Sequence, residues 1–347
     1  MKVLRLILLP FVPVYAAIIK VRNKFFDKNI FKEKEVNAKV ISVGNITIGG
    51  SGKTPLVIYL ANLLKNHNKA VGVLSRGYGR KSKGYLLVSD GENIFTSVDL
   101  SGDEIYHTAL ECNVPAAVSE KRFEGAKKLI KDTGIDTLIL DDAYQHRWIK
   151  RDINLLICEQ RFLQDTSLAN QSLLPSGNMR EPLDSIKRAD AVILNKKFSE
   201  RKEIPGKISK YFESKKIFSG FYKAIGFGDI KNHTQYDLEE FHGQKSLIVS
   251  GVANPFSFIN ILKQVHINTD NKLIFKDHKD YSLKEVRLIR KKFYSTNSQS
   301  VVTTEKDAVK LIKFSKELDD IDIFFLKIEL KIDNEKSFID FILNKLN

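Results

Sequence analysis

A glycine-rich loop between an expected strand and an expected helix is the feature that most constrains this chain. Residues 47–54 read Thr-Ile-Gly-Gly-Ser-Gly-Lys-Thr; the apolar run 40–43 precedes them, and an apolar-periodic stretch follows Pro55. Glycines allow successive backbone N–H groups to turn toward one anion, and the positive end of the following helix faces the same point. This order of strand, loop and helix predicts a nucleoside triphosphate site.

The loop residues have specific expected tasks. Lys53 would reach the β- and γ-phosphates, and the hydroxyl of Thr54 would complete the coordination shell of Mg²⁺. Thr47 departs from the strict pattern, because glycine is usual six residues before the lysine. We expect the triphosphate to be bound by the loop residues Thr47, Gly49, Gly50, Ser51, Gly52, Lys53 and Thr54.

A carboxylate at the end of an apolar strand is the second expected part of the site. The apolar run 137–140 ends in Asp141 and Asp142. Phosphoryl transfer needs an oxygen anchor for Mg²⁺ one strand away from the phosphate loop. A buried strand can also end in aspartate as a helix cap, but the phosphate loop upstream favours the metal role. We expect Thr54, Asp141 and Asp142 to hold magnesium.

Composition points to an anionic partner. The chain has 347 residues, a formal net charge of +14 and only two cysteines, Cys112 and Cys158. So few cysteines give neither a disulfide framework nor a metal-binding spacing, which suits a reducing cytosol. The charge suits nucleic acid, a membrane surface or a phosphorylated substrate. We find no nucleic-acid-reading motif, and therefore expect no nucleic-acid partner.

The N-terminus combines an uncharged apolar run with flanking cations. The run spans Leu6–Ile19, 14 residues including two prolines. As a helix it would extend about 21 Å, less than the ~30 Å hydrocarbon core of a bilayer. A signal peptide, a buried core helix and a full span are the alternatives. We favour a segment that lies in one leaflet with its cations on anionic headgroups.

The remaining pattern predicts an α/β fold. We expect a P-loop NTPase-like, mostly parallel sheet with helices on both faces, and a smaller C-terminal α/β lobe. The expected divisions are a membrane-associated segment 1–34, a P-loop core 35–215 and a C-terminal lobe 216–347. Besides the strand before the loop, expected strands are 71–75, 136–140, 153–158, 189–194, 246–250, 272–275, 301–303 and 323–328, with a hairpin at 85–97 and a lysine-rich crossover at 200–235.

Several distinctive blocks follow one another across residues 4–310. They are Ser42–Pro55, Ser75–Arg80, Gly102–Glu104, Asp141–His146, Leu174–Pro175, Arg180–Pro182, Ser250–Pro255, Phe275–His278 with Tyr281, and Thr303–Asp307. Together these blocks resemble the tetraacyldisaccharide 4′-kinases, the lipid A 4′-kinases of Gram-negative bacteria. The chain departs from the family pattern at Ala143 and Ala253, where glycine is expected or common, and at 178–179, where Pro-Leu is common.

The resemblance implies an activity and further site residues. It implies transfer of the ATP γ-phosphate to the 4′-hydroxyl of a tetraacylated glucosamine disaccharide 1-phosphate, at the cytoplasmic face of the inner membrane. It implies that Asp103 and His278 pair as the base. The catalytic role expected for Lys53 comes from the phosphate-loop pattern. From the residues alone, Asp103 would be a loop carboxylate and His278 a surface histidine. Expected substrate-side residues are Arg76, Arg122, Gln145, His146, Arg180 and Glu181, with His146 equally interpretable as structural.

Two other classes remain as alternatives. One is a membrane-associated P-loop switch. A guanine-specific switch usually carries the motif Asn-Lys-x-Asp, and this chain has Phe198 in place of the Asp, three residues after Asn195. The other is a nucleic-acid-dependent ATPase, which would explain the charge but not the N-terminus. We expect ATP and Mg²⁺ as cofactors, a lipid substrate and a membrane surface as partners, and no obligate protein partner.

Overall fold

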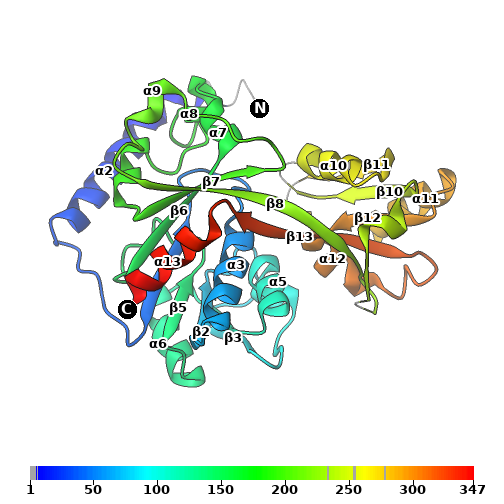
Figure 1. Cartoon of the computed structure of the whole chain (residues 1–347), viewed down its shortest axis with the longest axis horizontal. Coiled ribbons are helices and arrows are strands. Elements are labelled where there is room, and N and C mark those ends of the chain that lie inside the picture. Colours follow the sequence, from blue (N-terminus) through cyan, green and yellow to red (C-terminus); the bar gives the residue numbers. More distant parts are fainter. Residues whose placement is uncertain (1–4, 6, 233, 253–254, 277–278) are drawn as a thin grey trace. The chain divides into compact units, whose positions relative to one another are not determined.

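The computed structural model describes residue 5 and residues 7–232, 234–252, 255–276 and 279–347 (Figure 1). The chain forms two compact units. The first comprises Met1–Phe221 and Lys331–Asn347, and the second comprises Tyr222–Leu330. The sequence-based boundary lies at residue 216 and assigns the C-terminal end to the second lobe, whereas the structure groups the C-terminal helix with the first unit.

The first unit is built on a mostly parallel sheet, which confirms the expected α/β fold. Its strand order is β8-β7-β6-β1-β5-β2-β4-β3, and only the edge strand β3 runs antiparallel to its neighbour. The strands are β1 (Lys39–Gly44), β2 (Val71–Ser75), β3 (Leu86–Asp90), β4 (Pro115–Val118), β5 (Thr137–Leu140), β6 (Ile153–Glu159), β7 (Ala191–Lys197) and β8 (Lys216–Asp229), the last of which continues into the second unit.

Helices cover this sheet. The central strands β1, β2 and β5 are buried along almost their whole length, as a parallel sheet covered on both faces requires. Side chains of α6 pack with Val40, Leu74 and Leu138, and α3 packs against β1 and β2. The helices are α2 (Val12–Asp27), α3 (Lys53–Asn66), α4 (Val98–Ser101), α5 (Asp103–Cys112), α6 (Arg122–Thr133), α7 (Gln160–Gln164), α8 (Leu168–Gln171), α9 (Gly206–Ser209) and α13 (Glu335–Leu346), with 3₁₀ turns at Leu9–Phe11 and Leu183–Arg188.

The second unit is a smaller α/β unit. Its strand order is β11-β10-β12-β13-β8, with the short β9 paired to β8. A core of buried residues that includes Leu247, Ile289 and Val301 packs α11 against this sheet. The elements are β9 (Gln235–Tyr236), β10 (Lys245–Ser250), α10 (Pro255–Gln264), β11 (Asn268–Ile274), α11 (Leu283–Ser295), β12 (Ser300–Thr304), α12 (Glu305–Leu311) and β13 (Ile323–Ile332), with 3₁₀ turns at Leu238–Phe241 and Ile312–Phe314.

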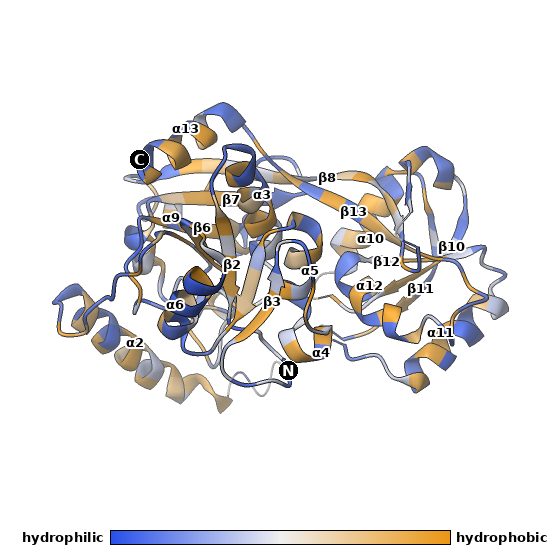
Figure 2. Ribbon diagram, turned by 90° about the horizontal axis from the view of Figure 1, so that it is seen from below, coloured by the Kyte–Doolittle hydropathy of each residue, from blue (hydrophilic) through white to orange (hydrophobic). Residues whose placement is uncertain are grey.

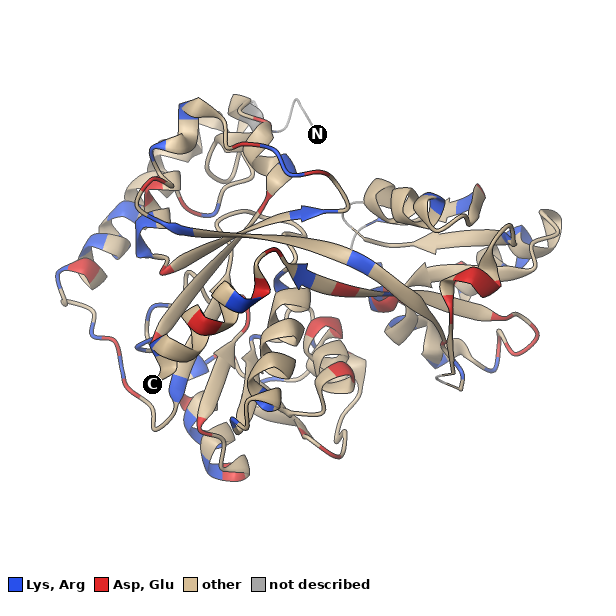
Figure 3. Ribbon diagram, in the orientation of Figure 1, with Lys and Arg blue, Asp and Glu red and all other residues tan. Residues whose placement is uncertain are grey.

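The N-terminal helix α2 has two unlike faces. Pro10 and Pro13 lie in the first turns of their helical segments, where a missing N–H costs little. Among the described residues, no helix is long and apolar enough to cross a membrane. The outer face carries large apolar side chains, each between 51% and 62% exposed, and basic residues lie along the same helix (Figures 2 and 3). We call the following set the apolar stripe: Ile7, Phe11, Val14, Ile18 and Val21.

Candidate functional site

The phosphate loop lies where the sequence predicts it, between β1 and α3. Gly49 and Gly52 have φ angles of +97° and +99°, a region that L side chains rarely adopt, so these two positions favour glycine. Gly52 caps the amino end of α3, and Lys53 and Thr54 form its first turn. Residues 47–54 therefore surround the positive end of a 14-residue helix, an arrangement suited to a phosphate group.

Buried amides hold this loop in shape. Asn45 donates from Nδ2 to Ser51 Oγ at 2.8 Å, and Asn195, at the end of β7, donates to the Ser51 carbonyl at 2.9 Å. Gln145 donates to the Asn45 carbonyl at 2.8 Å. A fourth residue, Arg151, donates to the carbonyls of the 143–146 segment. Sequence reasoning missed Asn45, Asn195 and Arg151; the only signal was an asparagine at the end of an apolar strand.

The two expected carboxylates lie beside the loop, because β5 pairs with β1 in parallel. Asp142 Oδ1 is 3.6 Å from Lys53 Nζ, and both Asp142 oxygens accept from Arg180 Nη1 at 3.0 Å. Asp141 accepts from Ser75 Oγ at 3.2 Å. Its other oxygen is buried without a hydrogen-bond partner among the described residues. The carboxylates thus face different partners.

The surroundings of Asp141 and Asp142 shift the pKa values of the two carboxyl groups in opposite directions. Burial, followed by the charges of Glu104 and Asp142, raises the pKa of Asp141 to about 7. Burial acts in the same direction on Asp142, but Lys53 and Arg180 outweigh it, so the pKa of Asp142 is lowered. Burial also lowers the pKa of Arg122 to about 10, which leaves it charged at neutral pH.

The residues expected to hold magnesium fit that ion in part. The unpartnered oxygen of Asp141 and the hydroxyl of Thr54 are the oxygen donors that Mg²⁺ prefers. Asp142 is engaged by Lys53 and Arg180. Within the described part of the chain, no cluster of three or more acidic, histidine or cysteine side chains could hold a metal. A nucleotide-bound Mg²⁺ needs only one or two carboxylates, since phosphates and water supply the rest.

The residues expected near the substrate differ in their exposure and in their contacts. Arg76, directly after β2, is exposed, whereas Arg122, at the start of α6, is buried. Gln145 supports the phosphate loop, and Arg180 binds Asp142. The Nε2 atom of His146 is buried without a partner in the described structure.

Glu181 is fully buried. Its carboxylate lies 2.7 Å from Arg188 and accepts from Asn23 at 3.2 Å. In this structure the Glu181 side chain is part of the scaffold beneath the site.

Only one member of the expected base pair is described. Asp103 begins α5 and is buried, and His278 lies outside the described residues. In the second unit, one buried carboxylate joins three of the family-like blocks. Asp307 accepts from the Gly251 N–H at 2.9 Å, from Thr304 at 2.8 Å and from the Tyr281 hydroxyl at 3.1 Å.

Helix α2 is fastened to the loops around the phosphate site. Tyr15 donates to the Arg180 carbonyl at 2.9 Å, Arg22 donates to the Gln145 carbonyl, and Asn23 donates to Glu181. At the other end of the helix, the ring of Phe26 lies 4.9 Å from that of Trp148, which is 39% exposed. The inner face of α2 is therefore part of the site's framework.

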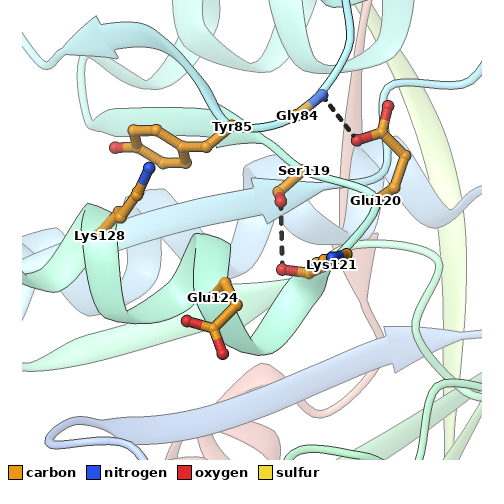
Figure 4. A pocket seen from close by; sticks show the side chains of 7 residues that line it. All are labelled: Gly84, Tyr85, Ser119, Glu120, Lys121, Glu124 and Lys128. Atoms are coloured by element: carbon orange, nitrogen blue, oxygen red, sulfur yellow. Dashed lines mark hydrogen bonds between the residues drawn. The ribbon is translucent and has the colours of Figure 1, made fainter.

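A cavity of about 330 Å³ lies beside the turn between β4 and α6 (Figure 4). Glu120, which lines the cavity, binds the 76–84 loop: the Glu120 carboxylate accepts from Arg80 at 2.6 Å and from the Gly84 N–H at 3.0 Å. No residue of the expected site lines the cavity, so we give it no part in the chemistry. The lining residues are Gly84, Tyr85, Ser119, Glu120, Lys121, Glu124 and Lys128.

Comparison with known proteins identifies the family. The family model LpxK, tetraacyldisaccharide-1-P 4′-kinase, matches residues 4–347. A tetraacyldisaccharide 4′-kinase of Aquifex aeolicus is 36% identical over 334 residues, 96% of each chain. One from Halothermothrix orenii is 34% identical, covering 92% of this chain and 87% of its own.

A solved structure matches as well. The crystal structure of LpxK from Aquifex aeolicus in complex with ATP has a TM-score of 0.82 and 34% identity, and the match covers 99% of this chain and 100% of that one. The sequence and structure matches thus span nearly the whole molecule. The chain belongs to the tetraacyldisaccharide 4′-kinase family.

Proposed function

We propose that this chain transfers the γ-phosphate of ATP to the 4′-hydroxyl of a tetraacylated glucosamine disaccharide 1-phosphate, a step of lipid A biosynthesis. The observation that carries the proposal is the phosphate loop, with Lys53 Nζ 3.6 Å from Asp142, in a chain that the model of this kinase family matches over residues 4–347. The relative crystallised with ATP supports ATP as the donor.

The chain's own residues would bind and orient the triphosphate. The backbone N–H groups of 49–54 and the ammonium of Lys53 would surround the β- and γ-phosphates, where negative charge is redistributed during transfer. Thr54 and Asp141 are the residues that would hold Mg²⁺, which supplies neutralising charge beside the phosphate oxygens when bound. Asp142, already paired with two cations, would fix the position of Lys53.

The acceptor hydroxyl needs a proton acceptor as it attacks. The 4′-oxygen forms a bond to the γ-phosphorus while the bond from that phosphorus to the bridging oxygen breaks, which releases ADP. We propose that Asp103, aided by His278, takes the hydroxyl proton. Family resemblance and the burial of Asp103 at a helix start support this assignment. Arg76 and Arg122 supply positive charge suited to an anionic substrate.

The substrate is a lipid, and α2 suits a lipid surface. The apolar stripe would enter one leaflet, and Lys20, Lys24 and Lys28 on the same segment would meet anionic headgroups, at about 1 kcal/mol each. This supports a peripheral or monotopic location at the cytoplasmic face of the inner membrane, where ATP and the lipid meet.

A direct assay tests the proposed function. Purified protein is incubated with γ-labelled ATP and the 1-phosphorylated tetraacyl disaccharide in mixed micelles. The matched control is the same lipid already phosphorylated at the 4′-position, and water alone serves as the second control. We expect label in the lipid only with the free 4′-hydroxyl. Release of free phosphate at equal rates in all three samples would instead identify an ATPase and overturn the proposal.

A further inference from the structure

One of the connections between the inner face of α2 and the phosphate site runs through the main-chain segment 178–181. Arg180 is fixed there on both sides of its backbone: its N–H donates to the Ile46 carbonyl at 2.7 Å, and its carbonyl accepts from Tyr15 at 2.9 Å. Ile46 precedes the phosphate loop directly. The segment is therefore held between the loop and the helix.

The side chain of Arg180 continues the connection. Its Nη1 lies 3.0 Å from both oxygens of Asp142, and Asp142 Oδ1 lies 3.6 Å from Lys53 Nζ. A series of contacts thus runs from the Tyr15 hydroxyl through Arg180 and Asp142 to the lysine of the phosphate loop. Among the described residues, α2 makes no direct hydrogen bond or ion pair with Asp142 or Lys53, so Tyr15 would act through Arg180.

We propose that Tyr15 is a positioning residue for phosphoryl transfer: its hydroxyl sets the backbone of Arg180, so that the guanidinium holds Asp142 against Lys53. The inference rests on the proposed function, since it concerns the same transfer. Burial, followed by the charge of Glu181, raises the pKa of Tyr15, so the hydroxyl keeps the proton that it donates.

The physical reason is the precision that charge stabilisation requires. Residues that align a charged group act through geometry, and small displacements from a transition-state oxygen are costly. Arg180 is only partly buried and has a long side chain, so a fixed backbone removes one source of freedom. The loss of one hydrogen bond typically weakens such a hold severalfold rather than abolishing it.

The test is a double-mutant cycle on kcat in mixed micelles, where membrane binding of α2 is not limiting. The variants are Tyr15→Phe, Arg180→Ala and the double substitution, with Tyr211→Phe as the matched control on the 204–212 segment. We expect Tyr15→Phe to lower kcat about three- to tenfold in the wild-type background and to have almost no effect in the Arg180→Ala background. Tyr211→Phe should leave kcat unchanged.

Melting temperatures separate positioning from plain stabilisation. The Tyr15 hydroxyl bonds the backbone of residue 180, so Tyr15→Phe should lower the melting temperature equally with or without Arg180→Ala. An equal loss of kcat in both backgrounds, or no loss in the wild-type background, overturns the inference. If Arg180→Ala leaves no measurable turnover, Arg180→Lys provides the second background. A wild-type chain that phosphorylates no lipid would refute the proposed function itself, independently of Tyr15.

Discussion

At the scale of single residues, the site is a set of opposed charges at fixed positions. Asp142 lies between Lys53 and Arg180, and Asp141 shares its buried surroundings with Arg122. Because the groups are partly or fully buried, solvent screens their interactions less than on the surface. Removing one charge is therefore expected to disturb the others.

Lys53→Ala tests the phosphate loop. We expect turnover to fall by ~10³-fold or more, because a cation aimed at the transferring phosphoryl group contributes mainly to the transition state. Lys39→Ala, a partly exposed lysine at the other end of β1, is the matched control. Steady-state kinetics with the lipid acceptor measure both. Retention of more than about a tenth of the turnover in Lys53→Ala would contradict the assignment.

His146 gives a pH prediction. Burial, followed by Arg122 and other nearby cations, lowers the pKa of His146 to about 3, from an ordinary value of 6.5. Between these two values the imidazole of the unfolded chain binds a proton, whereas that of the folded chain stays neutral. The free energy of unfolding therefore decreases as pH falls from about 6.5 toward 3.

His146→Asn cannot take up that proton. We expect its melting temperature to fall less between pH 7.5 and pH 5 than that of the wild type, with His242→Asn, on an exposed side chain, as the control. Parallel curves for His146→Asn and the wild type would show that His146 does not contribute.

The sequence predicted those site residues that are adjacent to one another in the chain. The phosphate loop and Asp141-Asp142 each follow a buried strand, so the apolar run directly before each of them predicts where it lies. Asn45 and Asn195 act by bonding the Ser51 hydroxyl and carbonyl. Asn195 bonds a carbonyl, a group that every residue has, so the sequence of the loop carries no mark of that contact. An asparagine at the end of an apolar strand is the only signal of either residue.

At the scale of elements, most strands followed from apolar runs, whereas β4, β8 and the two-residue β9 did not. β4 has only four residues and begins with Pro115, too short for a periodic signal. β8, Lys216–Asp229, falls in the region expected to be an irregular crossover. Its serine, lysine and glycine residues interrupt the apolar positions, so β8 lacks the continuous apolar run by which the other strands were predicted.

Helix α2 can be tested through its outer face alone. Deleting residues 1–24 would also remove Tyr15, Arg22 and Asn23 from the site. The double substitution Val14→Asp with Ile18→Asp instead places two charges on the apolar stripe.

We expect this variant to sediment with anionic vesicles much less than the wild type, because each charge must leave the bilayer interior. Leu288→Asp, at a 45% exposed position of α11, is the matched control and should bind as the wild type does. Equal sedimentation of the stripe variant and the wild type would place the membrane contact elsewhere in the chain.

At the scale of the whole molecule, the expected base is divided between the two units. Asp103 belongs to the first unit, whereas residue 278 falls within the second. The division could not be read from the sequence in full, because the C-terminal helix α13 returns to the first unit after β13. Tertiary contacts made by a chain end leave no local pattern.

A double-mutant cycle tests the base. If Asp103 and His278 act as one unit, Asp103→Ala and His278→Ala should each lower kcat by ~10²–10⁴-fold, with little effect on ATP binding. The double variant should then be little worse than the worse single variant. Turnover at the product of the two single effects would argue that the residues act independently.

The packing of the aromatic rings around α2 has an optical consequence. Trp148 is the only tryptophan in the sequence, and it contacts Phe26 and Phe31 where the N-terminal segment meets the segment that follows Asp141 and Asp142. Emission excited in the indole band therefore comes from this one place. Undocking of α2 would increase the exposure of the indole, which is 39% with the helix in place, and shift its emission to the red. The protein thus has an intrinsic fluorescent reporter of whether its N-terminal helix is bound to the rest of the first unit.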